Sequence, residues 1–113
     1  MKPTLRERNR YIAFEIISDK KFSKEEISRG IWNAVLRFLG ELGASKASLW
    51  LIDWDQEKQR GIFKISHTEL DNVKAALTLM KEIKTGENKI PAAYHTLGVS
   101  GTVKKTRQKF LKR

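Results

Sequence analysis

The sequence predicts an α+β fold of the ferredoxin-like class, a sandwich in which two helices cover one face of a four-stranded antiparallel sheet. Two observations predict it. Some segments alternate apolar and polar residues, as half-buried strands do, whereas others repeat apolar residues at helical spacing. These segments follow each other in the order β-α-β-β-α-β, which is the split βαβ arrangement. The 113 residues, 40% of them hydrophobic, suffice for one domain, and we expect residues 1–113 to form it.

The first half of the chain predicts a strand, a helix and a second strand. Residues 10–18 alternate in polarity and form the first strand. Ser23 and Glu26 have the spacing of a capping box, in which each side chain binds the other residue's backbone N–H, so we expect a helix to begin here. Residues 46–53 are apolar on both faces, which predicts a strand that is covered from both sides.

Glycines decide how the first helix ends. Gly43 is suited to the left-handed turn that closes many helices, so we expect the helix to end there. Gly30 and Gly40 weaken the helix interior and predict a kink or a break. The apolar residues at helical spacing in this segment are Ile27, Ile31, Ala34, Val35, Phe38 and Leu42.

The second half of the chain repeats the pattern after a polar hairpin loop. Residues 61–67 form the third predicted strand. Thr68 is the expected cap of a second helix, and Gly86 has the residue type that commonly follows a helix end. Residues 90–99 form the last strand, and Pro91 predicts that it lies at an edge of the sheet, since proline donates no backbone hydrogen bond.

The net charge of +10 is concentrated at the two ends of the chain. Residues 1–10 hold four basic side chains and one acidic one, and residues 102–113 hold six basic side chains and no acidic one, so nine of the ten excess charges lie there. Charge sorted in this way is typical of a surface that binds phosphates or anionic lipid. The alternative is that both ends are solvated tails without a partner.

The turn before the basic C-terminal segment has the composition of an anion site. Gly98 and Gly101 allow a tight or left-handed backbone around Ser100. A helix that begins at Thr102 directs its free N–H groups at this turn, with the Ser100 and Thr102 hydroxyls as further donors. A docked helix with a solvated basic face is the alternative. One side of this helix carries Lys104, Lys105, Lys109, Lys112 and Arg113, and the other carries Val103, Arg107, Phe110 and Leu111.

The open face of the predicted sheet offers little for stacking on nucleobases. RNA-recognition domains share this element order and present aromatic residues on their first and third strands. Here Tyr11 is the aromatic residue of the first strand, and Ile62 and Lys64 occupy the positions on the third. This apolar face, completed by Trp50 or Leu49, is therefore expected to be covered by the chain's own terminal helix, by a second copy or by another protein.

Candidate catalytic residues are few. The chain has no cysteine, which excludes disulfides and thiolate metal sites, and no stretch has the length of a transmembrane helix. We expect a soluble, cytoplasmic protein. Asp53 and Asp55 could hold a magnesium ion, as in a nuclease, or could stabilise the hairpin turn instead. His67 and His95 have no partners at ligand spacing, so no autonomous active site is expected.

Several stretches together resemble a known family. In order along the chain they are LRERNRYIAFEI, ASLWLIDWD, RGIFKISH, KAALTLMKEI and LGVSGTVKK. They resemble the archaeal ribonuclease P protein component 2 family, which is homologous to a small eukaryotic subunit shared by ribonucleases P and MRP. The resemblance extends over nearly the whole chain. It departs from the family pattern at Phe63 and Lys64, where many relatives have an aliphatic residue followed by arginine.

The resemblance implies a supporting role in a ribonucleoprotein. Ribonuclease P removes the 5′ leader of precursor tRNA, and its RNA holds the catalytic magnesium, so the protein is expected to bind no cofactor. The implied partners are ribonuclease P RNA, the TIM-barrel protein component 3 and, indirectly, precursor tRNA. The sequence also leaves open a homodimer and predicts no membrane association.

These arguments assign the candidate site residues. No residue is expected to be catalytic or to bind a metal. Tyr11, Trp50 and Ile62 are the candidates for a protein interface. The residues expected to contact RNA are Arg6, Arg8, Arg10, Ser100, Thr102, Lys104, Lys105, Arg107 and Lys109. The alternatives are a magnesium nuclease that uses Asp53 and Asp55, and a plain protein-interaction or oligomerisation module.

Overall fold

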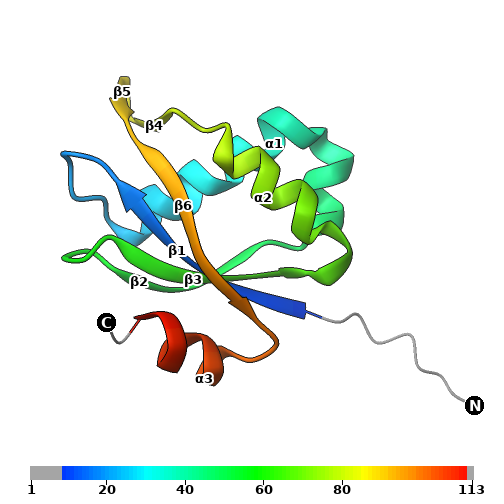
Figure 1. The fold of residues 1–113 in the computed structure, drawn as a ribbon. Coiled ribbons are helices and arrows are strands. Elements are labelled where there is room, and N and C mark those ends of the chain that lie inside the picture. The colour runs from blue at the N-terminus through cyan, green and yellow to red at the C-terminus, as the bar shows by residue number, and fades with distance from the viewer. Residues whose placement is uncertain (1–8, 112–113) are drawn as a thin grey trace, which may run out of the picture.

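The elements of the chain alternate much as the sequence predicts, with an additional hairpin before the last long strand (Figure 1). The computed structural model describes residues 9–111, except the side chains of residues 110 and 111. None of the described helices is long and apolar enough to cross a membrane. The elements are β1 (Asn9–Ile17), α1 (Lys24–Ala47), β2 (Trp50–Asp55), β3 (Arg60–Ser66), the 3-10 turn η1 (His67–Glu69), α2 (Leu70–Thr78), β4 (Glu82–Thr85), β5 (Asn88–Pro91), β6 (Ala93–Ser100), α3 (Val103–Thr106) and the π-helical turn η2 (Arg107–Leu111).

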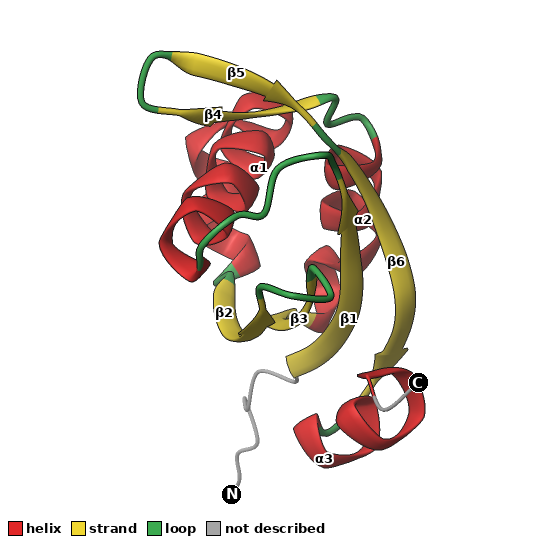
Figure 2. Cartoon of the chain, turned by 90° about the vertical axis from the view of Figure 1, so that its left-hand side faces the viewer, coloured by secondary structure: helices red, strands yellow, loops and turns green. Residues whose placement is uncertain are grey.

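The main sheet has the strand order β2-β3-β1-β6, and every neighbouring pair is antiparallel. Helices α1 and α2 lie on one face of the sheet, whereas α3 lies on the opposite face (Figure 1). Figure 2 shows β4 and β5 as a separate hairpin at the end of the molecule remote from α3. This topology confirms the predicted ferredoxin-like fold.

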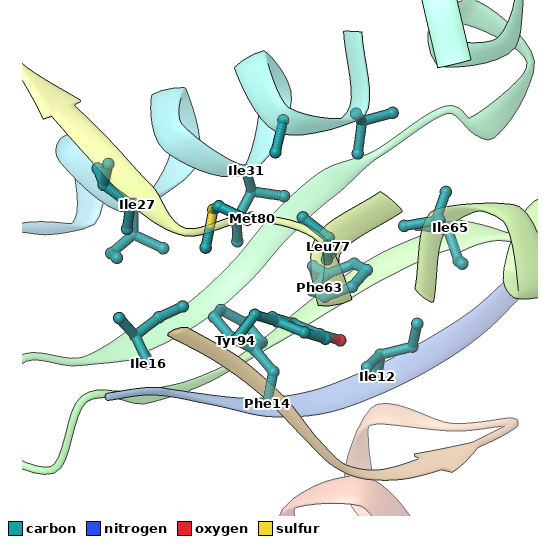
Figure 3. Packing of buried hydrophobic residues seen from close by; sticks show 14 of the residues in the cluster. Ile12, Phe14, Ile16, Ile27, Ile31, Phe63, Ile65, Leu77, Met80 and Tyr94 are labelled. Atoms are coloured by element: carbon teal, nitrogen blue, oxygen red, sulfur yellow. The ribbon is translucent and has the colours of Figure 1, made fainter. Parts of the chain in front are cut away.

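The core lies between the sheet and helices α1 and α2 (Figure 3). Alternation in β1 places Ile12, Phe14 and Ile16 on this side, where all three are buried. The ring of Phe14 stacks on the ring of Tyr94, with centroids 5.8 Å apart. The Tyr94 hydroxyl accepts a hydrogen bond from Thr96 Oγ1 at 2.8 Å, and burial raises the pKa of this phenol well above its ordinary value.

Helix α1 begins where the capping box predicts and ends later than expected. Ser23 Oγ accepts from the Glu26 N–H, and Glu26 Oε1 accepts from the Ser23 N–H. Gly40 adopts a φ of 75°, which confirms the predicted kink, and the helix then continues to Ala47. The prediction that Gly43 ends the helix is therefore wrong, and β2 begins at Trp50 instead of residue 46.

The kink changes which side chains of α1 reach the core. A residue with left-handed backbone interrupts the helical repeat, so positions on its two sides no longer share one face. After the kink, Leu42, expected in the apolar stripe, is 72% exposed, whereas Ala44 and Ala47 are buried. Phe38, also expected in this stripe, is 41% exposed but lies before Gly40, so the kink does not explain its exposure.

The segment after α2 forms a hairpin instead of a longer helix. Helix α2 ends at Thr78, and Gly86, with a φ of 62°, lies in the turn between β4 and β5. Ile83 of β4 packs against Gly30 of α1, where an added Cβ would lie 2.9 Å from an Ile83 methyl carbon. The expectation that Gly86 follows a helix end is wrong. Thr68 is also no cap, because its hydroxyl pairs with Ser66 Oγ at 3.1 Å.

Candidate nucleic-acid interface

The start of β1 and the end of β6 lie side by side, which brings Arg10 to the turn before α3. Tyr11 pairs with Ser100 across these two strands. The Arg10 Nη1 atom donates to the Asn9 carbonyl at 3.3 Å and lies 3.9 Å from the position of a Cβ built on Gly101. Arg6 and Arg8, also predicted to contact RNA, lie outside the described residues.

The turn itself is built differently from the prediction. Among the described glycines, only Gly40 and Gly86 have a positive φ, so of the two backbone conformations predicted for this turn, tight or left-handed, the left-handed one does not occur at Gly98 or Gly101. Gly98 lies in β6 and pairs with Ala13. Thr102 caps α3, since its Oγ1 accepts from the Lys105 N–H at 3.2 Å. A hydroxyl that accepts one bond can still donate its own proton to another oxygen.

The C-terminal segment covers the centre of the open sheet face. Both α3 and η2 contact β1, and the two together also reach β3 and β6. Beneath them Ala13 and Ile62 have no exposed surface, and Thr106 is buried. The Thr106 hydroxyl donates to the Thr102 carbonyl at 2.7 Å, which satisfies this buried polar group within the turn. The sequence left open whether the terminal helix, a second copy or another protein covers this face. In the structure the chain's own terminal segment covers its centre. Ile62 is covered by this segment, so of the three residues predicted for a protein interface it is the one without exposed surface.

One of the predicted RNA-contacting cations is paired within the protein. Arg107 Nη2 and Nε lie 2.7 Å and 2.9 Å from Asp53 Oδ2, which fastens the C-terminal segment to β2. Asp55 has a different role, since its Oδ1 accepts from the N–H groups of Glu57 and Lys58 in the β2–β3 turn. Within residues 9–111 no group of three or more His, Asp or Glu side chains is placed to hold a metal ion.

Three lysines of the same segment remain available. Lys104, Lys105 and Lys109 are exposed, and none of them forms an ion pair with a carboxylate of the described residues. Arg10 adds a fourth cation at the start of β1, beside the turn that leads into α3. We call Arg10, Lys104, Lys105 and Lys109 the basic end.

Two of the predicted protein-interface residues lie next to this basic end. Trp50, Lys64, Tyr11 and Ser100 are directly opposite one another on β2, β3, β1 and β6 and form one cross-strand row. Their neighbours Leu51 and Ile12 pack against the core, so the row belongs to the open face. Trp50 is 67% exposed, and Tyr11 and Lys64 are partly exposed.

The fold and this geometry define a small α+β sandwich that covers one face of its sheet with two helices and the other with its own basic C-terminal segment. The Rpp14/Pop5 family matches residues 10–111, so the chain belongs to this family.

Individual relatives agree with this assignment. Ribonuclease P protein component 2 of Pyrococcus furiosus is 47% identical over 109 residues, which cover 96% of this chain and 88% of that protein. The proteins of the same name from Thermococcus gammatolerans and Methanococcus aeolicus are 45% and 43% identical, over 96% and 97% of this chain and 88% and 77% of their own length. These matches confirm the resemblance found in the sequence.

A solved structure supports the fold independently. A chain in the cryo-EM structure of yeast ribonuclease MRP superposes with a TM-score of 0.68 at 18% sequence identity, over 89% of this chain and 79% of the other. At this identity the similarity shows the fold alone.

Proposed function

We propose that this protein is a non-catalytic subunit of ribonuclease P that binds the catalytic RNA and supports removal of the 5′ leader from precursor tRNA. The single observation that carries the proposal is the basic end, four cations at the start of β1 and on the C-terminal segment that have no carboxylate partner among the described residues. The names of the relatives, ribonuclease P protein component 2, supply the particular enzyme.

Docking of the C-terminal segment supports this function physically. Like charges at positions 105 and 109 destabilise an isolated helix, and nine helical residues are too few to be stable alone in water. Contacts with the sheet and the Arg107–Asp53 pair hold these cations in place before RNA arrives. A preorganised set of cations loses less conformational entropy on binding, which favours affinity for a phosphate backbone.

In this proposal the RNA supplies the catalytic magnesium and the protein supplies none. The carboxylates considered for a metal site already serve the protein, Asp53 through Arg107 and Asp55 through the turn. The remaining partners are the TIM-barrel component 3 and, in a homodimer, a second copy. Exposed apolar side chains away from the basic end, among them Phe38, Leu42 and Leu79, provide surface for such contacts.

The test compares two triple variants of the full chain. The first, the basic-end variant, carries Lys104→Gln, Lys105→Gln and Lys109→Gln. It removes three charges from the basic end and keeps the docked helix. Binding to ribonuclease P RNA is measured by fluorescence anisotropy over a range of KCl concentrations. The basic-end variant should bind more weakly, and the slope of log K against log salt should fall by about 0.7–0.9 for each phosphate that the variant no longer neutralises.

The matched control removes three lysines from the opposite end of the molecule. The control variant changes the net charge by the same amount and carries Lys81→Gln, Lys84→Gln and Lys89→Gln. These three positions lie on or beside the β4–β5 hairpin. The control should keep both the affinity and the slope. Equal losses in the two variants would mean that net charge alone drives binding, and cleavage of precursor tRNA by the purified protein would contradict a non-catalytic role.

A further inference from the structure

The open sheet face has three cross-strand rows, and one of them is suited to nucleobases. The middle row contains Ala13 and Ile62 and is covered by the C-terminal segment. The row at the far end contains Asp55, Glu15 and Arg60, and its Arg60–Glu15 ion pair has a 3.0 Å Nε–Oε2 distance. Carboxylates in that row repel phosphate. The remaining row, Trp50–Lys64–Tyr11–Ser100, contains no acidic residue and adjoins the basic end.

The chemistry of this row combines two aromatic rings with a cation between them. Within residues 9–111 the Lys64 ammonium has no ion-pair partner, and neither the Tyr11 hydroxyl nor the Trp50 Nε1 atom forms a hydrogen bond. Because neighbouring strands lie about 4.8 Å apart, the backbones that carry the two rings are separated by about 10 Å. That spacing provides two separate platforms instead of one stacked pair.

From this juxtaposition we infer that the Trp50–Lys64–Tyr11 row binds unpaired nucleotides of RNA, with a base stacked on each ring and a phosphate at Lys64. The inference rests on the proposed function, because it adds a single-stranded subsite to the surface that the basic end provides for RNA. Aromatic side chains accept any base on their faces, and cations along the same groove hold the backbone. The covered middle row limits the subsite to one or two bases.

Charge favours RNA over a protein as the occupant. The centre of a protein–protein interface is depleted of lysine, and here a lysine lies between the two aromatic residues. Arg10 and the lysines of α3 extend the positive potential from the row along the end of the sheet. This assigns Tyr11 and Trp50 to the nucleic-acid surface instead of the protein interface expected from the sequence.

The experiment measures binding of the full-length protein to a single-stranded oligouridylate and to a blunt-ended, two-stranded RNA stem that has no loop. Trp50→Ala and Tyr11→Ala should each weaken binding of the oligouridylate by about fivefold to a hundredfold, since each removes one stacking platform. Tyr11→Phe should bind like the parent because it keeps the ring. Binding of the stem, which has no unpaired bases, should change little in any of these variants.

The control is Trp32→Ala. Trp32 is a partly exposed tryptophan of α1 that borders a groove shared with Trp50 between α1 and β2. It lies outside the cross-strand row, so its loss should not affect the oligouridylate. If Trp32→Ala and Trp50→Ala were equivalent, or if both left RNA binding intact and instead weakened binding of the component 3 protein, the assignment to nucleotides would be overturned.

The two proposals fail in different ways. Unchanged oligouridylate affinity in Trp50→Ala and Tyr11→Ala, with strong salt-dependent binding of the stem, overturns the stacking subsite and leaves the RNA-binding role intact. If the basic-end variant binds both the oligouridylate and the stem as tightly as the parent does, the proposed function itself is overturned.

Discussion

At the scale of single residues, Gly61 lies where the neighbouring strand leaves no room for a side chain. A Cβ at this position would lie 2.4 Å from the Asp53 carbonyl oxygen of the neighbouring strand and 2.9 Å from the Trp54 ring. Gly61→Ala should therefore destabilise the protein by about 1–3 kcal/mol, because β2 and β3 cannot separate without losing sheet hydrogen bonds. Urea denaturation measures the free energy of unfolding of each variant.

Gly101→Ala is the matched control for this substitution. Its Cβ would meet only the Arg10 guanidinium, at an ordinary van der Waals distance of 3.9 Å, and its backbone needs no left-handed φ. Its free energy of unfolding should stay within about 0.5 kcal/mol of the parent. Equal destabilisation by both substitutions would show that glycine itself, and not the space around Gly61, decides the effect.

A second residue-scale prediction concerns the carboxylate that holds Arg107. Both partners are about half exposed, so the ion pair contributes little stability, and Asp53→Asn should cost less than about 1 kcal/mol. The substitution removes a negative charge and releases the guanidinium beside the basic end. Contacts of α3 and η2 with the sheet still dock the segment, so the added net charge should outweigh the lost preorganisation. RNA should then bind more tightly at low salt, with a slope of log K against log salt steeper by about 0.7–0.9 if Arg107 reaches a phosphate.

The same variant also tests the alternative of a magnesium nuclease. An enzyme that relied on Asp53 as a metal ligand would lose activity in Asp53→Asn, whereas a supporting subunit would gain RNA affinity. Anisotropy titrations and cleavage of precursor tRNA by the reconstituted enzyme distinguish the two outcomes. If Asp53→Asn bound RNA more weakly with its fold intact, the Asp53 carboxylate would not be what keeps Arg107 from contacting RNA.

At the scale of elements, the N-terminus of α1 makes stability depend on pH. The backbone N–H of Ser23 and, next, the Lys20 side chain hydrogen-bond the Glu26 carboxylate, which lowers its pKa from the ordinary value of 4.5. A carboxyl group whose pKa is lower in the folded state stabilises the fold above the unfolded-state pKa, and this contribution is lost as pH falls through the folded-state pKa. Glu26→Gln should therefore be less stable than the parent at pH 7, by about 0.3–1 kcal/mol.

Thermal or urea denaturation between pH 7 and pH 2.5 checks this dependence. The difference between parent and Glu26→Gln should shrink once the pH falls below about 4.5. Glu25→Gln is the control, since Glu25 lies in the same helical turn but outside the capping box. A difference that stayed constant down to pH 2.5 would mean that the charge of Glu26 is not what stabilises α1.

The elements that sequence reasoning predicted correctly are those whose signals are local. The capping box at Ser23 and the alternation in β1 each lie within a few residues, so the start of α1 and the core face of β1 follow from the sequence. The sequence does not predict the β4–β5 hairpin, because Ile83 keeps the helical spacing of the apolar residues that precede it. Polar residues on either side of Gly86 were the available turn signal, and packing of Ile83 against Gly30, 53 positions away, overrides the helical pattern.

In the candidate site, too, the features with local sequence signals could be predicted, whereas those that depend on distant residues could not. Thr102 as a helix cap and the exposed lysines of the C-terminal segment follow from local sequence. The Arg107–Asp53 pair spans 54 positions, and the row that joins Trp50, Lys64 and Tyr11 depends on the register of three strands. Register is fixed by the whole sheet, so no local pattern could show that these side chains share one surface.

At the scale of the whole molecule, the basic side chains and the exposed apolar side chains lie on different parts of the surface. Helix α3 lies on the face of the sheet opposite α1 and α2 (Figure 1), and the cross-strand row belongs to the same open face. Exposed apolar residues such as Leu42 and Leu79 lie in α1 and directly after α2. A subunit arranged in this way can contact RNA with one side while another protein packs on the other. The separation explains how a nearly neutral body can carry strongly basic ends without losing its apolar contact surface.

The last prediction concerns the C-terminal segment, which serves both stability and charge. Truncation after Gly101 removes its cations, but it also uncovers Ile62 and Ala13 at the centre of the open face. Exposing a fully buried isoleucine costs about 1.5–3 kcal/mol, so the truncated protein should unfold at lower urea concentration. The uncovered apolar face should also promote self-association, measurable by sedimentation velocity as a concentration-dependent shift to larger species.

The Lys104→Gln, Lys105→Gln and Lys109→Gln variant separates the two roles. It retains Thr106 and Arg107, which dock the segment on the sheet, so its stability and its sedimentation coefficient should match those of the parent while its RNA affinity falls. Loss of RNA binding after truncation cannot by itself be attributed to charge, because the same deletion alters the surface that carries the cross-strand row. If the truncated chain kept the parent's stability and showed no self-association, the C-terminal segment would be a tethered cationic tail and not a layer of the fold.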